Sequence, residues 1–286
     1  MITIDDNYLE VAFNLLLSLK KYHKDLVIHV IYDNLSAKSV KKLMNFVEEE
    51  KIGVVQLYYF DFSSSDFSII QNDYISTTCY FRLYAPYIIT DVDRLLYLDP
   101  DIICQKNLED LYNTDLGDNI IGACPNMLRD NTWYLKDIIL ENLHLPYETE
   151  YVNSGVLLID MKKYREYLPM EILNDFLHEK KDIIEYQDQD TLNCLFLDKI
   201  KILPNYYNYQ INAVDLWNLN FDQALIHYSE AKKPWKKDYA DIVRGRPYYE
   251  FLHELGRDKE LKELMMQHGY NNAGLLYDEI IYGEKE

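Results

Sequence analysis

The sequence predicts an α/β protein with a mostly parallel central sheet, and two observations support this fold class. Short apolar segments rich in β-branched residues alternate with amphipathic helical segments through most of the chain. The chain is also large enough, with 286 residues of which 48% are hydrophobic, to bury a substantial core in one or two domains. Because ligands of such sheets bind at the carboxyl ends of the strands, the residues after each strand are the first functional candidates.

The individual elements follow from apolar runs and capping residues. Ser36 is a typical N-cap, so a helix begins there and extends to Glu50. A polar loop is expected at residues 63–68, and residues 1–4 leave room only for a short first strand. The remaining expected strands are residues 26–32, 54–60, 94–98, 119–123 and 155–160. The remaining expected helices are residues 76–90 and 161–180.

The pattern becomes helical and charged from residue 236 onward. We therefore expect an α/β domain over residues 1–235 and an extension of two or three helices over residues 236–286 that packs on it. The aromatic residues 248–251 can form an exposed interface or pack within the chain, which leaves the oligomeric state open.

Charge and composition exclude several classes of partner and location. The formal net charge of −19 repels nucleic acid and anionic membranes, so we expect no nucleic-acid partner. No apolar run approaches the roughly 20 residues of a membrane span, and the first turns are acidic where a signal peptide is basic. We therefore expect a cytoplasmic protein without a membrane span, at most peripheral at the inner face. Free buried thiols in a reducing compartment are expected for Cys79, Cys104, Cys124 and Cys194.

An acidic pair follows the apolar strand at residues 94–98. Asp99 and Asp101 are two positions apart, so their side chains point the same way in an extended chain. Two such carboxylates repel each other unless a cation lies between them, and Mg²⁺ or Mn²⁺ takes oxygen ligands of this kind. The alternative is a loop that ends in solvated aspartates, which is common in a chain with 48 acidic residues.

A histidine near the other end of the chain is a candidate third ligand. His227 ends an apolar strand, and a neutral imidazole can bind Mn²⁺. Lys232 and Lys233 follow it and can hold phosphate oxygens. A lone histidine is more often a core residue, but this one is followed by lysines and a Pro-Trp pair.

Further polar residues stand where a core would be apolar. Asn153 and Ser154 precede the strand at residues 155–160. Asp188 and Gln189 lie at a helix entrance and are candidates for ligand binding, whereas Asp190 is interpreted as a capping residue.

Arg82 stands on an otherwise apolar helix. A buried arginine needs an anionic partner, and either a diphosphate or the Asp99 and Asp101 pair would serve.

Six segments together resemble the family-8 glycosyltransferases of the GT-A fold, the group that contains lipopolysaccharide galactosyl- and glucosyltransferases and glycogenin. They occur in the family's order over residues 3–235 and read TIDDNY, TTCYFRLYAPYI, LYLDPDI, YVNSGVLLIDMKKYR, YQDQDTLN and HYSEAKKPW. The resemblance implies retaining transfer of a hexose from UDP-glucose or UDP-galactose, with Mn²⁺ or Mg²⁺, to a glycan, lipid-linked or protein acceptor.

The resemblance also implies roles for individual residues. The family's uracil and ribose contacts match Asp5, Asn7 and Tyr8. Its Mn²⁺ ligands match Asp99, Asp101 and His227. Its phosphate-binding lysine matches Lys233, and a conspicuous arginine near the donor matches Arg82. Positions that line the donor sugar match Asn153, Asp188 and Gln189, with Gln189 nearest the face opposite the leaving group.

Two departures from the family pattern bear on donor use. Glu230 stands where the family usually carries a glycine beside the phosphates, and Asn126 stands where many relatives have an aspartate on the donor sugar.

Two other functions are alternatives to a glycosyltransferase: a sugar-nucleotide-binding protein without catalysis and a phosphohydrolase with an aspartate nucleophile. The second would need a hydroxyl two residues beyond Asp101, where this chain has Ile103.

Overall fold

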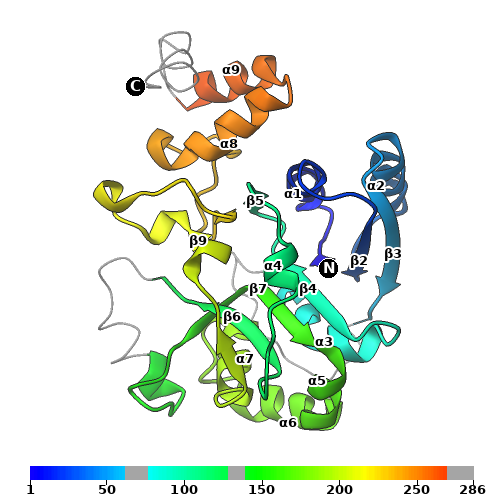
Figure 1. The fold of residues 1–286 in the computed structure, drawn as a ribbon, viewed down its shortest axis with the longest axis vertical. Coiled ribbons are helices and arrows are strands. Elements are labelled where there is room, and N and C mark those ends of the chain that lie inside the picture. The colour runs from blue at the N-terminus through cyan, green and yellow to red at the C-terminus, as the bar shows by residue number, and fades with distance from the viewer. Residues whose placement is uncertain (62–76, 128–138, 269–286) are drawn as a thin grey trace.

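A computed structural model describes residues 1–61, 77–127 and 139–268 of the chain (Figure 1). The polar loop expected at residues 63–68 lies outside the described residues. Two groups of strands make up the main sheet. The first group contains β1 (Ile2–Thr3), β2 (Leu26–Tyr32) and β3 (Gly53–Tyr59). The second contains β4 (Arg94–Leu98), β6 (Ile121–Pro125), β7 (Val152–Asp160) and β8 (Ile200–Ile202).

The two groups form one continuous sheet because β1 lies beside β4. The Met1 amino group donates to the Leu96 carbonyl at 2.7 Å, and the Leu98 amide donates to the Met1 carbonyl at 3.1 Å. The strand order is therefore β3-β2-β1-β4-β7-β6-β8. The pairs β1–β2, β2–β3 and β6–β8 are parallel, whereas β7 is antiparallel to both β4 and β6.

Helices cover the sheet over two apolar cores (Figure 1). One core involves α1 (Leu9–Lys20) and α2 (Ala37–Glu49). The other involves α3 (Phe81–Ile88), α5 (Met161–Tyr167), α6 (Met170–Lys180) and α7 (Gln187–Leu195). The short helices η1 (Thr77–Tyr80) and α4 (Glu109–Tyr112) lie between these elements along the chain.

Several element boundaries differ from the prediction for local reasons. Ser36 does cap α2, accepting a hydrogen bond from the Ser39 amide at 3.2 Å. The helix expected at residues 161–180 is interrupted before Pro169, because proline lacks an amide hydrogen and restricts the preceding residue. Strand β7 begins at Val152, so Asn153 lies on the strand and not before it.

A small second sheet brings distant parts of the chain together. It contains β5 (Ile102–Cys104), β9 (Tyr209–Gln210) and β10 (Leu225–His227), with β10 antiparallel to β5 and parallel to β9. His227 is paired with Ile102, which places it beside the segment that follows β4. The 3-10 helices near this sheet are η3 (Asn205–Tyr207), η4 (Ile211–Ala213) and η5 (Leu216–Asn218).

The C-terminal helices α8 (Ile242–Glu254) and α9 (Asp258–Gln267) share a third core with residues of this small sheet. Tyr248, Tyr249 and Phe251 are each at most 5% exposed, so these aromatic residues pack within the chain and do not form an exposed interface. Within the described residues, none of the helices is long and apolar enough to cross a membrane.

Candidate metal and donor site

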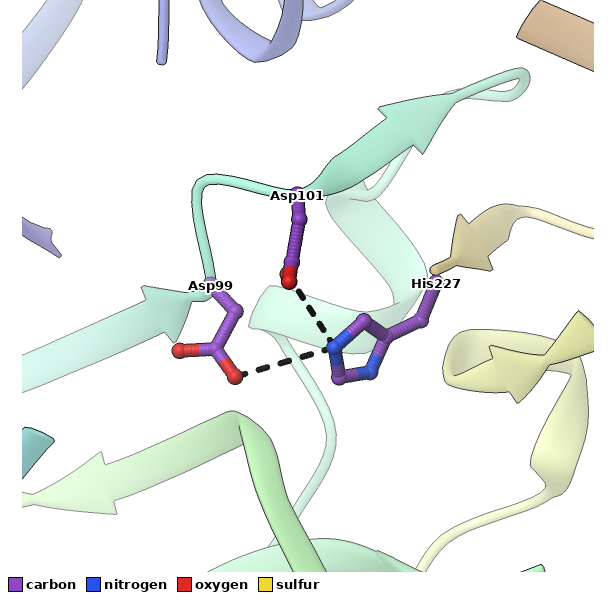
Figure 2. A group of neighbouring side chains, drawn as sticks. All are labelled: Asp99, Asp101 and His227. Atoms are coloured by element: carbon purple, nitrogen blue, oxygen red, sulfur yellow. Dashed lines mark ion pairs between the residues drawn. The ribbon is translucent and has the colours of Figure 1, made fainter. Parts of the chain in front are cut away.

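Three side chains from different elements meet at the edge where β4 ends. Asp99 follows β4, Asp101 precedes β5, and His227 ends β10 (Figure 2). The His227 Nε2 atom lies 3.1 Å from Asp101 Oδ1 and 3.7 Å from Asp99 Oδ2. All the candidate ligand atoms lie within 4.8 Å of one another, which is close enough to share one cation. Two carboxylate oxygens and one imidazole nitrogen suit Mn²⁺ or a similar divalent ion.

Each of these side chains is held through the atom that faces away from the centre. Asp99 Oδ1 accepts a hydrogen bond from the Tyr97 hydroxyl. Asp101 Oδ2 accepts one from Lys233 Nζ at 2.7 Å, and His227 Nδ1 lies 2.8 Å from Asn208 Oδ1. Partners of this kind fix the orientation of metal ligands. The atoms left for a cation are Asp99 Oδ2, Asp101 Oδ1 and His227 Nε2.

The electrostatics of Asp101 fit a cation at this centre. Among the described residues its buried Oδ1 atom has no hydrogen-bond partner, a costly arrangement that a bound cation would relieve. Burial alone would raise the pKa of Asp101, but the ammonium of Lys233 lowers it below its ordinary value. The carboxylate is therefore ionised and ready to bind a metal at neutral pH.

A glycine makes room for the cluster. A Cβ atom on Gly155 would lie 2.4 Å from His227 Cε1 and 2.8 Å from Asp99 Oδ2. Any side chain at this position of β7 would therefore collide with two of the three candidate ligands. The site residues fit a metal only because Gly155 lacks a side chain.

Arg82 joins the metal cluster to the candidate sugar residues. Its guanidinium is buried, with Nη2 2.9 Å from Asp99 Oδ1 and Nε 3.1 Å from Asp188 Oδ2. Burial alone would lower the pKa of Arg82, but Asp188 and Asp99 raise it well above its ordinary value. The structure thus supplies the expected anionic partner at Asp99 and adds a second at Asp188. Burial raises the pKa of Asp188.

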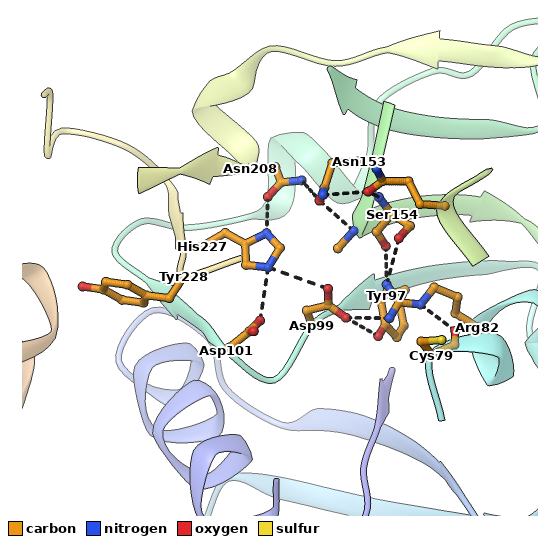
Figure 3. A network of polar contacts seen from close by, with 12 residues as sticks. Cys79, Arg82, Tyr97, Asp99, Asp101, Asn153, Ser154, Asn208, His227 and Tyr228 are labelled. Atoms are coloured by element: carbon orange, nitrogen blue, oxygen red, sulfur yellow. Dashed lines mark hydrogen bonds and ion pairs between the residues drawn. The ribbon is translucent and has the colours of Figure 1, made fainter. Parts of the chain in front are cut away.

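Asn153 and Asn208 lie in one hydrogen-bond network (Figure 3), to which Gln189 also belongs. Gln189 Oε1 accepts from Asn153 Nδ2 at 2.8 Å and from the Ser154 amide at 3.2 Å. Asn153 Oδ1 accepts from Asn208 Nδ2 at 2.8 Å, and Asn208 in turn contacts His227. The candidate sugar residues and the candidate metal ligand are therefore connected through two buried asparagines.

Asp190 has a structural role, as its interpretation as a capping residue implied. It is fully buried, and its Oδ2 atom accepts hydrogen bonds from the Glu185 and Tyr186 amides at 2.7 and 2.8 Å. The carboxylate therefore holds the turn before α7, the helix that carries Asp188 and Gln189.

The candidate nucleotide residues lie where β1 ends. Asp5 Oδ1 accepts hydrogen bonds from the Asn7 amide at 2.9 Å and the Tyr8 amide at 3.0 Å, which forms a tight turn. The Asn7 side chain is exposed and Tyr8 is half-buried. Burial and the charges of Asp101 and Asp99 raise the pKa of Tyr8, so its phenol lies near the metal cluster.

The two departures from the family pattern take different positions. Glu230 is exposed, and Lys232 close to it along the chain is exposed as well. Asn126 lies at the margin of the network, where its Oδ1 accepts a hydrogen bond from Asn153 Nδ2 at 3.4 Å. Asn126 is thus the departure that contacts a candidate sugar residue.

Tyr97, Gly155 and Asn208 are site residues that sequence reasoning missed. Tyr97 stands two positions before Asp99 near the end of the apolar strand, and a glycine in an apolar strand indicates close approach, so both carried a signal. Asn208 follows the short η3 helix, outside any regular periodicity, and carried none.

The chain is similar to known glycosyltransferases along most of its length. The family model described as glycosyl transferase family 8 matches residues 1–239. A lipopolysaccharide 1,2-glucosyltransferase of Escherichia coli is 26% identical over 299 residues, covering 99% of this chain and 85% of the relative. The same-named enzyme of strain K12 is 30% identical, covering 71% of this chain and 67% of the relative. The chain spans 56% of a putative glycosyltransferase of Haemophilus influenzae, which is 28% identical.

The fold is also that of a solved glycosyltransferase. The galactosyltransferase LgtC, solved in complex with donor and acceptor sugar analogues, superposes with a TM-score of 0.73 and 26% identity, covering 90% of this chain and 94% of LgtC. The expected α/β class and the resemblance drawn from the six sequence segments are both confirmed. Because the family model spans most of the residues, the chain belongs to glycosyl transferase family 8, a family of glycosyltransferase enzymes.

Proposed function

We propose that the chain transfers glucose or galactose from a UDP-sugar to a glycan, lipid-linked or protein acceptor, with Mn²⁺ or Mg²⁺ and with retention of anomeric configuration. One observation carries the proposal. Asp99, Asp101 and His227 each have one atom fixed by a neighbour and one atom directed at a common centre. Such a preorganised centre at the carboxyl edge of the sheet suits the diphosphate of a sugar nucleotide.

Residues around this centre would contact two parts of the donor, the diphosphate and the nucleoside. When bound, the metal ion would supply electrostatic stabilisation of the charge that develops on the departing UDP. Lys233 already lies against Asp101, so its ammonium is close enough to neutralise a phosphate oxygen beside the metal ligands. Asp5, Asn7 and Tyr8, at the end of β1, would bind uracil and ribose.

The candidate sugar residues favour a front-face reaction. Gln189 is an amide and a poor nucleophile, and its side chain is held by Asn153, the Ser154 amide and Tyr151. We therefore propose that the bond from the anomeric carbon to phosphate breaks while the acceptor oxygen bonds on the same face. The acceptor hydroxyl proton then passes to the leaving phosphate. Asp188 and Asn153 would orient the sugar and support positive charge on its ring.

The arrangement of the whole chain fits this activity. We assign residues 1–235 to the GT-A catalytic domain and residues 236–286 to a C-terminal extension, whose described part contains α8 and α9 and packs on the small sheet. The two Escherichia coli relatives are lipopolysaccharide 1,2-glucosyltransferases, which supports a cell-envelope polysaccharide as the product. We place the reaction in the cytoplasm, where UDP-sugars are made, with peripheral contact at the inner face of the membrane.

The direct test is hydrolysis of a panel of UDP-sugars without acceptor. We expect slow release of UDP from UDP-glucose or UDP-galactose with Mn²⁺ and none with EDTA. Proton NMR should show the α-hexose first, because retention preserves the donor configuration. Asp101→Asn should abolish the release of UDP. The control is Asp160→Asn, which removes the side-chain cap of α5 and changes none of the three candidate metal ligands, so it should preserve the release. No release from any donor together with no UDP binding would contradict the proposal.

A further inference from the structure

Asn208 occupies a position between the two halves of the candidate site (Figure 3). It is 0% exposed and lies between η3 and β9. Its Nδ2 atom donates to Asn153 Oδ1 at 2.8 Å, and its Oδ1 atom lies 2.8 Å from His227 Nδ1. A single side-chain amide thus touches a candidate sugar residue at one end and a candidate metal ligand at the other.

Backbone amides determine which atom donates and which accepts in the hydrogen bonds that connect Asn153, Asn208 and His227. Asn153 Oδ1 accepts from the Gly155 amide at 2.9 Å, a donor that cannot be reversed. Asn208 must therefore turn its Nδ2 toward Asn153 and its Oδ1 toward His227. His227 then carries its proton on Nδ1, which leaves the Nε2 lone pair facing Asp99 and Asp101.

The far end of the network is anchored in the same way. Gln189 Oε1 accepts from the Ser154 amide at 3.2 Å, so the oxygen of Gln189 must face Asn153. Asn153 consequently presents its Nδ2 to Gln189 and its Oδ1 to Asn208. The hydrogen bond from the Gly155 amide thereby determines the orientation of the Asn208 amide, and the hydrogen bond from the Ser154 amide is consistent with this orientation.

We propose that Asn208 is the positioning residue that couples the metal site to the donor-sugar site. It fixes the tautomer and ring orientation of His227, and with the same amide it fixes the orientation of Asn153. The inference rests on the proposed function, because it takes His227 as a metal ligand and Asn153 as a sugar contact. Hydrogen-bond partners behind a metal-binding histidine set both its geometry and its affinity for the ion.

Two substitutions separate the two contacts of Asn208. Asn208→Ala removes both, so we expect Mn²⁺ affinity to fall about 10- to 100-fold and kcat for UDP-sugar hydrolysis to fall as well. Asn208→Asp keeps an oxygen that accepts from His227 but loses the donor to Asn153. We expect this variant to bind Mn²⁺ within about threefold of the native chain while kcat falls about 10-fold or more.

Two other asparagines provide controls. Asn205→Ala changes the same short segment, but the Asn205 Oδ1 atom has no hydrogen-bond partner within the described structure, so we expect native Mn²⁺ affinity and kcat. Asn193 is a buried amide whose hydrogen bonds within the described residues go to the backbone of Val152 and Gln189 and not to the three candidate metal ligands. Asn193→Ala should lower the melting temperature without changing Mn²⁺ affinity, which calibrates the effect of losing a buried amide.

The experiment measures Mn²⁺ binding calorimetrically, together with kcat and melting temperature, for the native chain and the four variants. The expected result is loss of affinity in Asn208→Ala and its rescue in Asn208→Asp, with kcat reduced in both. Native Mn²⁺ affinity in Asn208→Ala would overturn the inference and leave the proposed function intact. A native chain that neither binds Mn²⁺ nor releases UDP would instead overturn the proposed function, and the inference with it.

Discussion

Replacing Gly155 with alanine places a methyl group inside the metal cluster. The added Cβ would lie 2.4 Å from His227 Cε1, 2.8 Å from Asp99 Oδ2 and 2.9 Å from His227 Nδ1. Ordinary contacts of this kind begin at 3.4 Å, so the His227 ring would have to withdraw by about 1 Å. The ring cannot do so freely, because its Nδ1 atom is bonded to Asn208 and the side chain is buried.

The cost of this substitution can be estimated from the alternatives open to the chain. If the imidazole moves, a buried hydrogen bond to Asn208 is lost, which costs about 1 kcal/mol. If β7 moves instead, overpacking costs about 1–3 kcal/mol. Displacement of the imidazole removes one of three protein ligands from its bonding position. We therefore expect unfolding free energy to fall by about 1–3 kcal/mol and Mn²⁺ affinity to fall by about 100-fold or more.

The assay compares Mn²⁺ binding and urea unfolding of Gly155→Ala with those of Gly122→Ala. A Cβ on Gly122, in the neighbouring strand β6, would meet only the ends of the Leu116 and Leu203 side chains at 3.1 Å. Those ends can shift, so Gly122→Ala should keep native Mn²⁺ affinity with a small loss of stability. Native affinity in Gly155→Ala would refute the reasoning, because it would mean that His227 and Asp99 do not enclose this glycine.

Three further predictions follow from the contacts around the cluster. Tyr97→Phe removes a donor to Asp99, so Mn²⁺ affinity measured by calorimetry should fall about 10-fold, and an unchanged affinity would argue against this contact. Arg82→Leu removes the charge partner of the buried Asp188 and of the partly buried Asp99, and should lower the unfolding free energy in urea by about 3–5 kcal/mol. Burial raises the pKa of Asp188 and Arg82 lowers it, so the loss of Arg82 should raise this pKa further. A raised folded pKa means that stability is lost as pH rises through it, so the Arg82→Leu deficit should be larger at pH 8 than at pH 5, and equal deficits would contradict this. Burial raises the pKa of the Cys104 and Cys124 thiols to about 12, so neither should react with Ellman's reagent at pH 8 until the chain unfolds, and fast reaction of either in the native chain would count against its burial. Cys194, which was expected to be buried, is only partly buried.

The sequence predicts the parts of the site that follow regular strands. Asp99, Asp101 and His227 each stand beside an apolar strand, and their chemistry alone suggested a shared metal site. The structure brings the three residues together because β10 pairs with β5, although more than a hundred positions separate these two strands along the chain. Strand ends thus indicated which residues to examine, while the pairing that joins them is a long-range property.

Other features could not be predicted because they depend on neighbours in space. The alternation of apolar and helical segments does not specify strand direction, so the reversal of β7 was not visible. Arg82 was expected to meet an anion, but its contact with Asp188 depends on how α3 and α7 pack. Asn208 lies in an irregular segment, where no periodicity indicates which side chains are buried together.

The measurement that tests the account most directly is a crystal structure of the chain with Mn²⁺ and UDP, with anomalous data collected near the manganese edge. The account predicts one strong peak about 2.0–2.3 Å from three atoms, Asp99 Oδ2, Asp101 Oδ1 and His227 Nε2, with the UDP diphosphate beside it. UDP bound without a metal peak at these atoms, or manganese bound elsewhere, would contradict the central claim that this cluster holds the donor.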